Sequence, residues 1–177
     1  MFYAMTHVSR SRVRVLGSTT GCTWPSVDRV RACALADETP ALITEYSPGP
    51  SSAVAFIDWM IPTFRHDLLV AATPLIADQV AVVPGVVDTD REERGIVNTT
   101  RSVECLDVKG SLIAEWRTNR RGVRYPIVHT LKIDPEPARG LHIFRVRLVE
   151  TWPIVSQDLR DVIERFEPTG VSFDLVG

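Results

Sequence analysis

The feature that most constrains the fold of this chain is a period-two alternation of apolar and polar residues in its C-terminal half. The clearest run is residues 142–148, in which three apolar side chains alternate with two arginines: Phe144, Val146, Leu148, Arg145 and Arg147. Successive side chains of a β-strand point to opposite faces, so the pattern predicts a half-buried strand. We expect the three apolar side chains to face the core and both arginines to point away from it.

A second alternating run covers residues 125–133 and ends at Pro135, because proline cannot extend a central strand. Four residues of this run are expected to share one face of the strand: Ile127, His129, Leu131 and Ile133. Shorter runs typical of strands cover residues 12–16, 96–100, 102–106, 112–116 and 171–175.

Two segments have the pattern of short helices. The stronger follows Ser156, a good helix N-cap, and its apolar side chains recur at helical spacing: Leu159, Val162, Ile163 and Phe166. Gly170 is expected to supply the turn that follows it. A shorter helix is predicted after the apolar strand-like run 68–71, with Thr73 as N-cap and Pro74 in the first helical position.

This order of elements predicts an α+β fold, with a largely antiparallel sheet and two or three short helices packed on it. Residues 1–60 are loosely patterned, and the turn-rich stretch 47–52 lies near the end of this region. We therefore expect a loosely patterned N-terminal region at 1–60 and the main α+β domain at 61–177.

Composition and charge exclude several classes of protein. The 177 residues include 45% hydrophobic and 24% charged residues, which is ordinary for a globular protein. A formal net charge of −2 is not that of a typical nucleic-acid-binding protein. No apolar run reaches the roughly eighteen residues of a membrane span, and the basic N-terminus lacks the apolar part of a secretion signal. We expect a cytoplasmic protein.

No arrangement of residues predicts an enzyme. The three cysteines form neither a disulfide framework nor a metal-binding pair. The four histidines lie outside any HExxH or Cys/His cluster, and the chain has no GxSxG motif or phosphate-binding glycine loop. No catalytic residue, metal or cofactor is therefore expected.

Two charged segments are candidates for binding a partner. The acidic segment, defined as Asp88, Asp90, Glu92 and Glu93, is predicted to lie in an exposed loop. The arginine cluster consists of Arg117, Arg120, Arg121 and Arg124, with Trp116 beside it, around a predicted hairpin tip at 119–122. Either segment could simply be solvated surface. We favour the acidic segment, because a projecting loop can enter a positively charged cleft without disturbing the fold.

Four stretches of the C-terminal half occur in an order that resembles a known family. They are Ile96–Asn98 with Val103–Asp107 and Ser111, then Gly140–Arg145, Ile154–Arg160 and Thr169–Phe173. Together, over about residues 65–177, they resemble immunity-protein family eleven of bacterial polymorphic toxin systems. The chain departs from the family in having Glu104 where Asp is usual, and in the arginine-rich insert 117–124.

The resemblance implies that the protein binds and neutralises a cognate toxin. The alternative is a non-enzymatic adaptor or nucleic-acid-associated module that uses the arginine cluster. The family's motif positions are expected to be structural, with Arg145 paired to the carboxylate of Asp107. These positions are Asp107, Phe144, Arg145, Ser156, Gly170 and Phe173.

Overall fold

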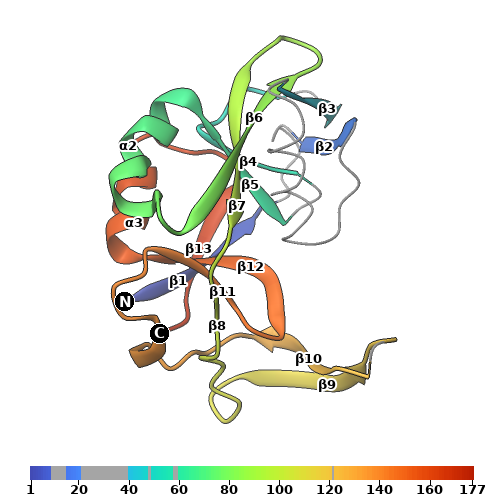
Figure 1. Ribbon diagram of the computed structural model, residues 1–177, viewed down its shortest axis with the longest axis vertical. Coiled ribbons are helices and arrows are strands. Elements are labelled where there is room, and N and C mark those ends of the chain that lie inside the picture. Colours follow the sequence, from blue (N-terminus) through green and yellow to red (C-terminus); the bar gives the residue numbers. More distant parts are fainter. Residues whose placement is uncertain (9–14, 21–39, 48, 58–59, 121) are drawn as a thin grey trace.

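The computed structural model describes the chain except for residues 9–14, 21–39, 48, 58–59 and 121. It contains a closed β-barrel, a five-stranded sheet, two α-helices beside them, and a two-stranded hairpin that projects from the far end (Figure 1). Antiparallel pairs predominate, with parallel contacts at three places, so the predicted α+β class is confirmed.

The barrel has the strand order β2-β3-β6-β7-β5-β4. Its interior is filled mainly by branched aliphatic side chains, including Ile43, Ile57 and Ile96. The strands are β2 (Val15–Thr20), β3 (Ala41–Ser47), β4 (Val54–Ile57), β5 (Ile61–Arg65), β6 (Val80–Val87) and β7 (Glu93–Thr99). Of the predicted strand at 12–16, residues 12–14 lie outside the described residues.

The five-stranded sheet has the order β13-β1-β12-β11-β8. Its strands are β1 (Phe2–His7), β8 (Ser102–Val103), β11 (Ile143–Val146), β12 (Val149–Ser156) and β13 (Val171–Leu175). Strand β1 pairs antiparallel with both β12 and β13, so the first strand of the chain is built into a sheet of C-terminal strands. The predicted division of the chain at residue 60 stays a prediction.

The largest core cluster lies where the barrel, the sheet and the helices meet. Helices α2 (His66–Ile76) and α3 (Gln157–Glu164) lie side by side against it (Figure 1). The cluster includes Phe56 and Phe64 from the barrel, Met5 and Ile143 from the sheet, Leu68 from α2, and Leu159 from α3. A second cluster, around Phe2 and Phe144, contains sheet residues that the first does not.

Helix α2 begins earlier than the sequence predicts. Residues 68–71 are helical, so their prediction as a strand is wrong, and Thr73 and Pro74 lie inside the helix rather than at its start. The helix buries Leu68, Ala72 and Ile76 at a spacing of four residues, and this packing outweighs the local proline signal. Pro74 stands in the last turn, where it removes only one helical hydrogen bond. Thr73 Oγ1 donates to the Leu69 carbonyl instead of capping.

The alternation in residues 142–148 correctly predicts strand β11 but not its exposure. Phe144 and Val146 are fully buried, whereas Leu148 is 40% exposed and has a positive φ of 72° in the turn to β12. Arg145 is buried, contrary to the prediction, because both faces of β11 are covered: all four residues of the strand are buried. On such a strand a polar residue need not point to solvent.

Arg145 does not pair with Asp107, so that prediction is also wrong. Its guanidinium donates from Nη1 to the backbone carbonyl of Glu150, and burial lowers the pKa of Arg145, while the nearby Glu150 charge raises it. Asp107 is structural in another way. Its Oδ1 accepts hydrogen bonds from the backbone N–H groups of Lys109 and Gly110, at 3.0 and 2.9 Å, and so holds a turn.

The second alternating run forms β10 (Arg124–Thr130), which pairs with β9 (Leu112–Thr118). The four residues expected to share one face differ in exposure: Leu131 and Ile133 are buried, but His129 is exposed, and Val128 packs against the second core cluster. The pairing shifts register on both sides of Val128. Such irregularities turn a strand over, so a single face cannot be extrapolated through them.

Helix α3 confirms the prediction around Ser156. Leu159 and Ile163 are buried, and Ser156 Oγ accepts a hydrogen bond from the Leu159 N–H at 3.3 Å. Gly170 has a φ of +79°, the left-handed conformation that glycine adopts without strain. Phe173 is half-buried against the large cluster rather than fully inside it.

Removing the Ser156 hydroxyl should therefore destabilise the protein modestly. We expect Ser156→Ala to lower the free energy of unfolding by about 1 kcal/mol, because the Leu159 N–H loses its capping acceptor. Urea denaturation monitored by far-ultraviolet circular dichroism measures the loss. Ser156→Asp, which keeps a capping oxygen, is the control, and a stability equal to that of the alanine variant would contradict the capping role.

Candidate functional site

A serine, a histidine and an aspartate lie together at the start of α3, but their geometry is that of a helix cap. His142 Nδ1 lies 2.8 Å from Ser156 Oγ and 3.8 Å from a carboxylate oxygen of Asp158. A catalytic triad needs the serine and the carboxylate on opposite ring nitrogens. Here the same nitrogen faces both groups, and Ser156 Oγ also accepts the Leu159 N–H. The three residues do not form a nucleophilic site.

The described part of the chain contains no group of three or more His, Cys, Asp or Glu side chains placed to hold a metal ion. Cys105 is buried, and burial together with the nearby Asp134 charge raises the pKa of its thiol to about 11. A thiol that stays protonated is a poor nucleophile. Cys22 and Cys33 lie outside the described residues. No described helix is long and apolar enough to cross a membrane.

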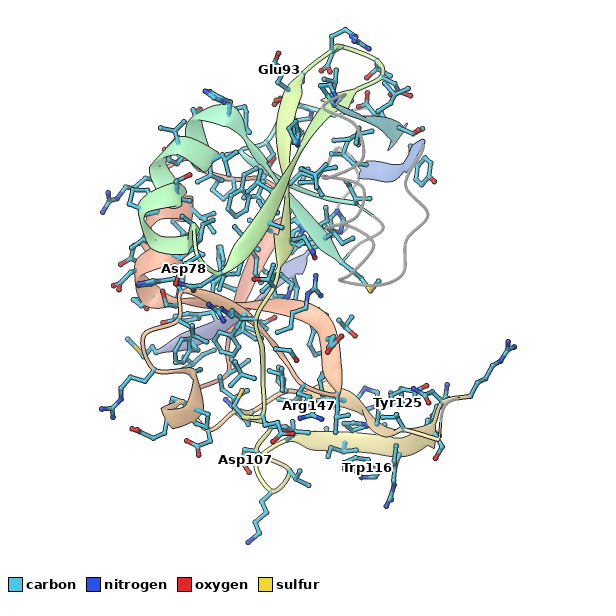
Figure 2. All side chains as sticks on the ribbon, viewed as in Figure 1. Asp78, Glu93, Asp107, Trp116, Tyr125 and Arg147 are labelled. Carbon is cyan, nitrogen blue, oxygen red and sulfur yellow. The ribbon has the colours of Figure 1, made fainter. Side chains whose placement is uncertain are left out.

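The acidic segment lies at the hairpin turn between β6 and β7, at one end of the molecule, where Figure 2 labels Glu93. Asp88, Asp90 and Glu93 are exposed as predicted, but Glu92 is half-buried. Asp88 Oδ1 accepts the backbone N–H of Glu45 at 3.0 Å, and Asp90 Oδ1 accepts that of Glu92 at 3.1 Å. Part of this segment therefore organises the barrel end.

Glu92 is tied to an arginine buried in the barrel. The Arg94 side chain is fully buried, and its Nη1 lies 3.0 Å from Glu92 Oε2. Arg94 Nε donates to Thr63 Oγ1 at 2.9 Å, and Nη2 donates to the Ser52 carbonyl at 2.7 Å. The sequence patterns do not single out this arginine. In the sequence it stands among the charged residues that precede Ile96 and Val97, and nothing local marks it as buried.

The β9–β10 hairpin, which we call the arm, projects from the opposite end of the molecule (Figures 1 and 2). It is a separate two-stranded sheet, and nearly every side chain of β9 is exposed. The predicted hairpin tip is confirmed: the Asn119 N–H donates to the Val123 carbonyl at 2.9 Å, and Gly122 has a φ of +77°.

The arm brings together most of the arginine cluster. The Arg124 guanidinium lies over the Trp116 ring, 4.9 Å from its centre, and Arg117 forms an ion pair with Glu115. Arg120 is exposed in the turn, and Arg121 lies outside the described residues. Figure 2 shows Trp116 and Tyr125 on opposite sides of the arm, in agreement with the register that pairs Tyr125 with Arg117.

Apolar surface on and beside the arm was not singled out by the sequence. Leu112 is 59% exposed and Val123 is 45% exposed. At the base of the arm, Leu148 helps to line a hollow of about 160 Å³ together with Tyr125, Ile127 and Trp152. These residues belong to alternating strand patterns, and alternation alone predicts one buried face. The arm projects away from the barrel and from the five-stranded sheet, so neither of its faces is fully covered. Only the tertiary structure shows this.

Comparison with protein-family models gives a match over residues 89–177, half of the chain, to the model described as Immunity protein family (Imm11). This range contains the four stretches on which the resemblance was based, although it begins after residue 65. Curated proteins give no match. The match covers the whole arm and the C-terminal strands of the sheet, and on this evidence the chain belongs to the immunity protein family Imm11.

Proposed function

We propose that this immunity protein acts by binding a cognate toxin and blocking it stoichiometrically, in the cytoplasm and without catalysing a reaction. The family match over residues 89–177 is the observation that carries the proposal. The capping geometry at Ser156 is consistent with a binding role.

Two surfaces could contact the toxin, and we propose the arm as the main one. Protein interfaces draw most of their binding energy from a few aromatic and arginine side chains. The arm supplies Trp116, Arg117, Arg124 and Tyr125. Its exposed aliphatic residues would be dehydrated on binding, which adds a hydrophobic contribution.

The acidic segment is the second candidate, and its exposure at a hairpin turn supports it. Asp88, Asp90 and Glu93 could face a positively charged toxin cleft. Glu92 is a poor contact residue, because its carboxylate pairs with buried Arg94. Reversing all four acidic charges would therefore damage the barrel as well as the surface. Neutral replacements at the three exposed positions test the segment more cleanly.

The two surfaces are distinguished by two separate triple substitutions. We expect the arm variant Arg117→Glu, Arg120→Glu, Arg124→Glu to bind the toxin at least about tenfold more weakly and to lose protection of toxin-expressing cells. The acidic-segment variant Asp88→Asn, Asp90→Asn, Glu93→Gln should keep both properties. The probe is the product of a toxin-like reading frame in the neighbouring gene, inactivated for calorimetry and active for the protection assay.

Arg139→Glu controls for a general charge effect, because Arg139 is an exposed arginine outside the arm. If only the acidic-segment variant lost protection, the toxin would bind at the barrel end rather than at the arm. No binding by the unmodified chain would refute toxin neutralisation itself.

The arginine cluster and the Trp116 stack leave a nucleic-acid-associated module as the other function class, because such side chains also contact phosphates and bases. Fluorescence anisotropy with single-stranded RNA at physiological salt separates the classes. The proposed function requires toxin binding to exceed RNA binding under those conditions.

A further inference from the structure

The outer edge of β9 is an open strand edge. The arm contains two strands, and in the described structure no further strand pairs with β9. Hydrogen-bonded and non-hydrogen-bonded pairs alternate along an antiparallel ladder. The bond from Asn119 N to the Val123 carbonyl makes Arg117–Tyr125 a hydrogen-bonded pair. The N–H and C=O groups of Trp116 and Thr118 therefore point outward.

The other edge of the arm is blocked by a proline. Pro126 pairs with Trp116, at a position where the N–H of β10 would point away from β9. Proline has no N–H to offer there, which is how natural sheets often close an edge. An added strand would therefore meet a missing donor on β10, whereas on β9 it would meet the outward N–H and C=O groups of Trp116 and Thr118.

The arm also has little packing of its own. A two-stranded sheet is at best marginally stable in water, and three strands or a covering layer are normally needed. The side chains of β9 are exposed over all but one of its residues, including Leu112 and Trp116. A third strand would supply both the missing backbone partners and some of the missing side-chain cover.

The charge of the arm indicates which kind of partner could pair with the outer edge of β9. Residues 112–130 contain four arginines and one glutamate, in a chain whose formal net charge is −2. Arg117 lies on one face and Arg124 on the other, since their cross-strand partners are Tyr125 and Thr118. A second copy would set like charges together. A nucleic acid would leave the backbone edge unpaired and gain nothing from Leu112 and Val123.

We propose that the outer edge of β9 receives an extended, acidic segment of the toxin as an added β-strand. The inference rests on the proposed function and specifies how the partner is held. Backbone hydrogen bonds to Trp116 and Thr118 would align the segment, as in other cases of strand addition. The guanidinium groups of Arg117 and Arg124 would select carboxylate side chains on either face of the added strand.

Amide hydrogen exchange of the full chain, alone and with the inactivated toxin domain, tests the proposal directly. The amides of Trp116 and Thr118 should exchange quickly in the free chain and become protected in the complex. The amide of Arg117 is the internal control, because it already bonds within the arm and should change less than the other two amides when the toxin binds. Toxin binding without protection at Trp116 and Thr118 would overturn the edge inference while leaving toxin neutralisation intact.

A proline substitution provides the second test. Thr118→Pro removes an outward N–H without removing a β9–β10 hydrogen bond, so toxin affinity should fall about tenfold. Thr118→Val keeps the N–H and a strand-forming side chain, and should bind within about twofold of the unmodified chain. Equal affinity of the two variants would contradict the proposal.

The same exchange experiment excludes the other occupants. Protection of Trp116 and Thr118 in concentrated chain without toxin would show self-pairing, and protection by single-stranded RNA would show a nucleic-acid site. Either result would overturn the proposal. Failure of the unmodified chain to bind the toxin is a separate result, which would refute the proposed function.

Discussion

Replacing Arg94 with alanine should destabilise the protein by about 3–5 kcal/mol, because the substitution breaks a buried ion pair and removes a donor shared by several buried acceptors. The Glu92 carboxylate, Thr63 Oγ1 and the Ser52 carbonyl all accept from this one guanidinium. Loss of the arginine leaves a half-buried negative charge at the barrel end. Urea denaturation, monitored by tryptophan fluorescence, measures the change.

A double-mutant cycle with Glu92→Gln separates the ion pair from the rest of the network. Lysine at position 94 should restore little, because its ammonium group lacks the planar fork that reaches several acceptors. Arg139→Ala is the matched control: its ion pair with Glu136 is exposed, so its loss should cost less than about 1 kcal/mol. A similar cost for Arg94 and Arg139 would show that water replaces the buried guanidinium.

Phe144→Ala should also cost about 3–5 kcal/mol, through a cavity in the second core cluster. The Phe144 side chain is fully buried, and its ring packs edge-on against Phe2 with 5.3 Å between ring centres. Removing it takes away both the buried ring and the contact that joins β11 to the first strand of the chain. Thermal and urea unfolding of the purified variant measure the loss.

Leu148→Ala is the control for Phe144, because the two residues occupy the same alternating run. Leu148 is exposed in a turn, so its replacement should change stability by less than about 0.5 kcal/mol. Phe173→Ala should fall between the two, since Phe173 is half-buried and lies near the Arg160 guanidinium, 5.6 Å from the ring centre. Equal losses at Phe144 and Leu148 would contradict the burial of β11 as described.

Local patterns predicted most elements of the C-terminal half. Ser156 and the spacing of Leu159 and Ile163 predicted α3 and its cap, because both depend on contacts within a few residues. Alternation predicted β11 and β13, and Gly170 marked the turn before β13. The arginine cluster was correctly placed around a hairpin, although Trp116 and Arg124 meet only through cross-strand pairing.

Elements that depend on distant partners were missed. The closed barrel joins β2 and β3 to strands from residues 54–99, and no local pattern encodes which strand will pair with which. Helix α2 contains Pro74, a residue that favours a helix start by its own chemistry. In the structure Pro74 lies near the end of the helix instead. Burial of Leu68, Ala72 and Ile76 against the largest core cluster stabilises the helix by more than one missing hydrogen bond costs.

The sequence by itself determined the α+β class, the capped helix after Ser156, the chemistry of the two charged segments and the resemblance to an immunity family. Each of these features depends on residue types and on spacings of a few residues, which are fixed by the sequence before the chain folds. Only the tertiary structure decided that Arg145 is buried, that Glu92 forms an ion pair with Arg94, and that β9 presents an open edge. Burial and pairing are properties of neighbours brought together by folding, and alternation along one strand does not specify what lies opposite either face.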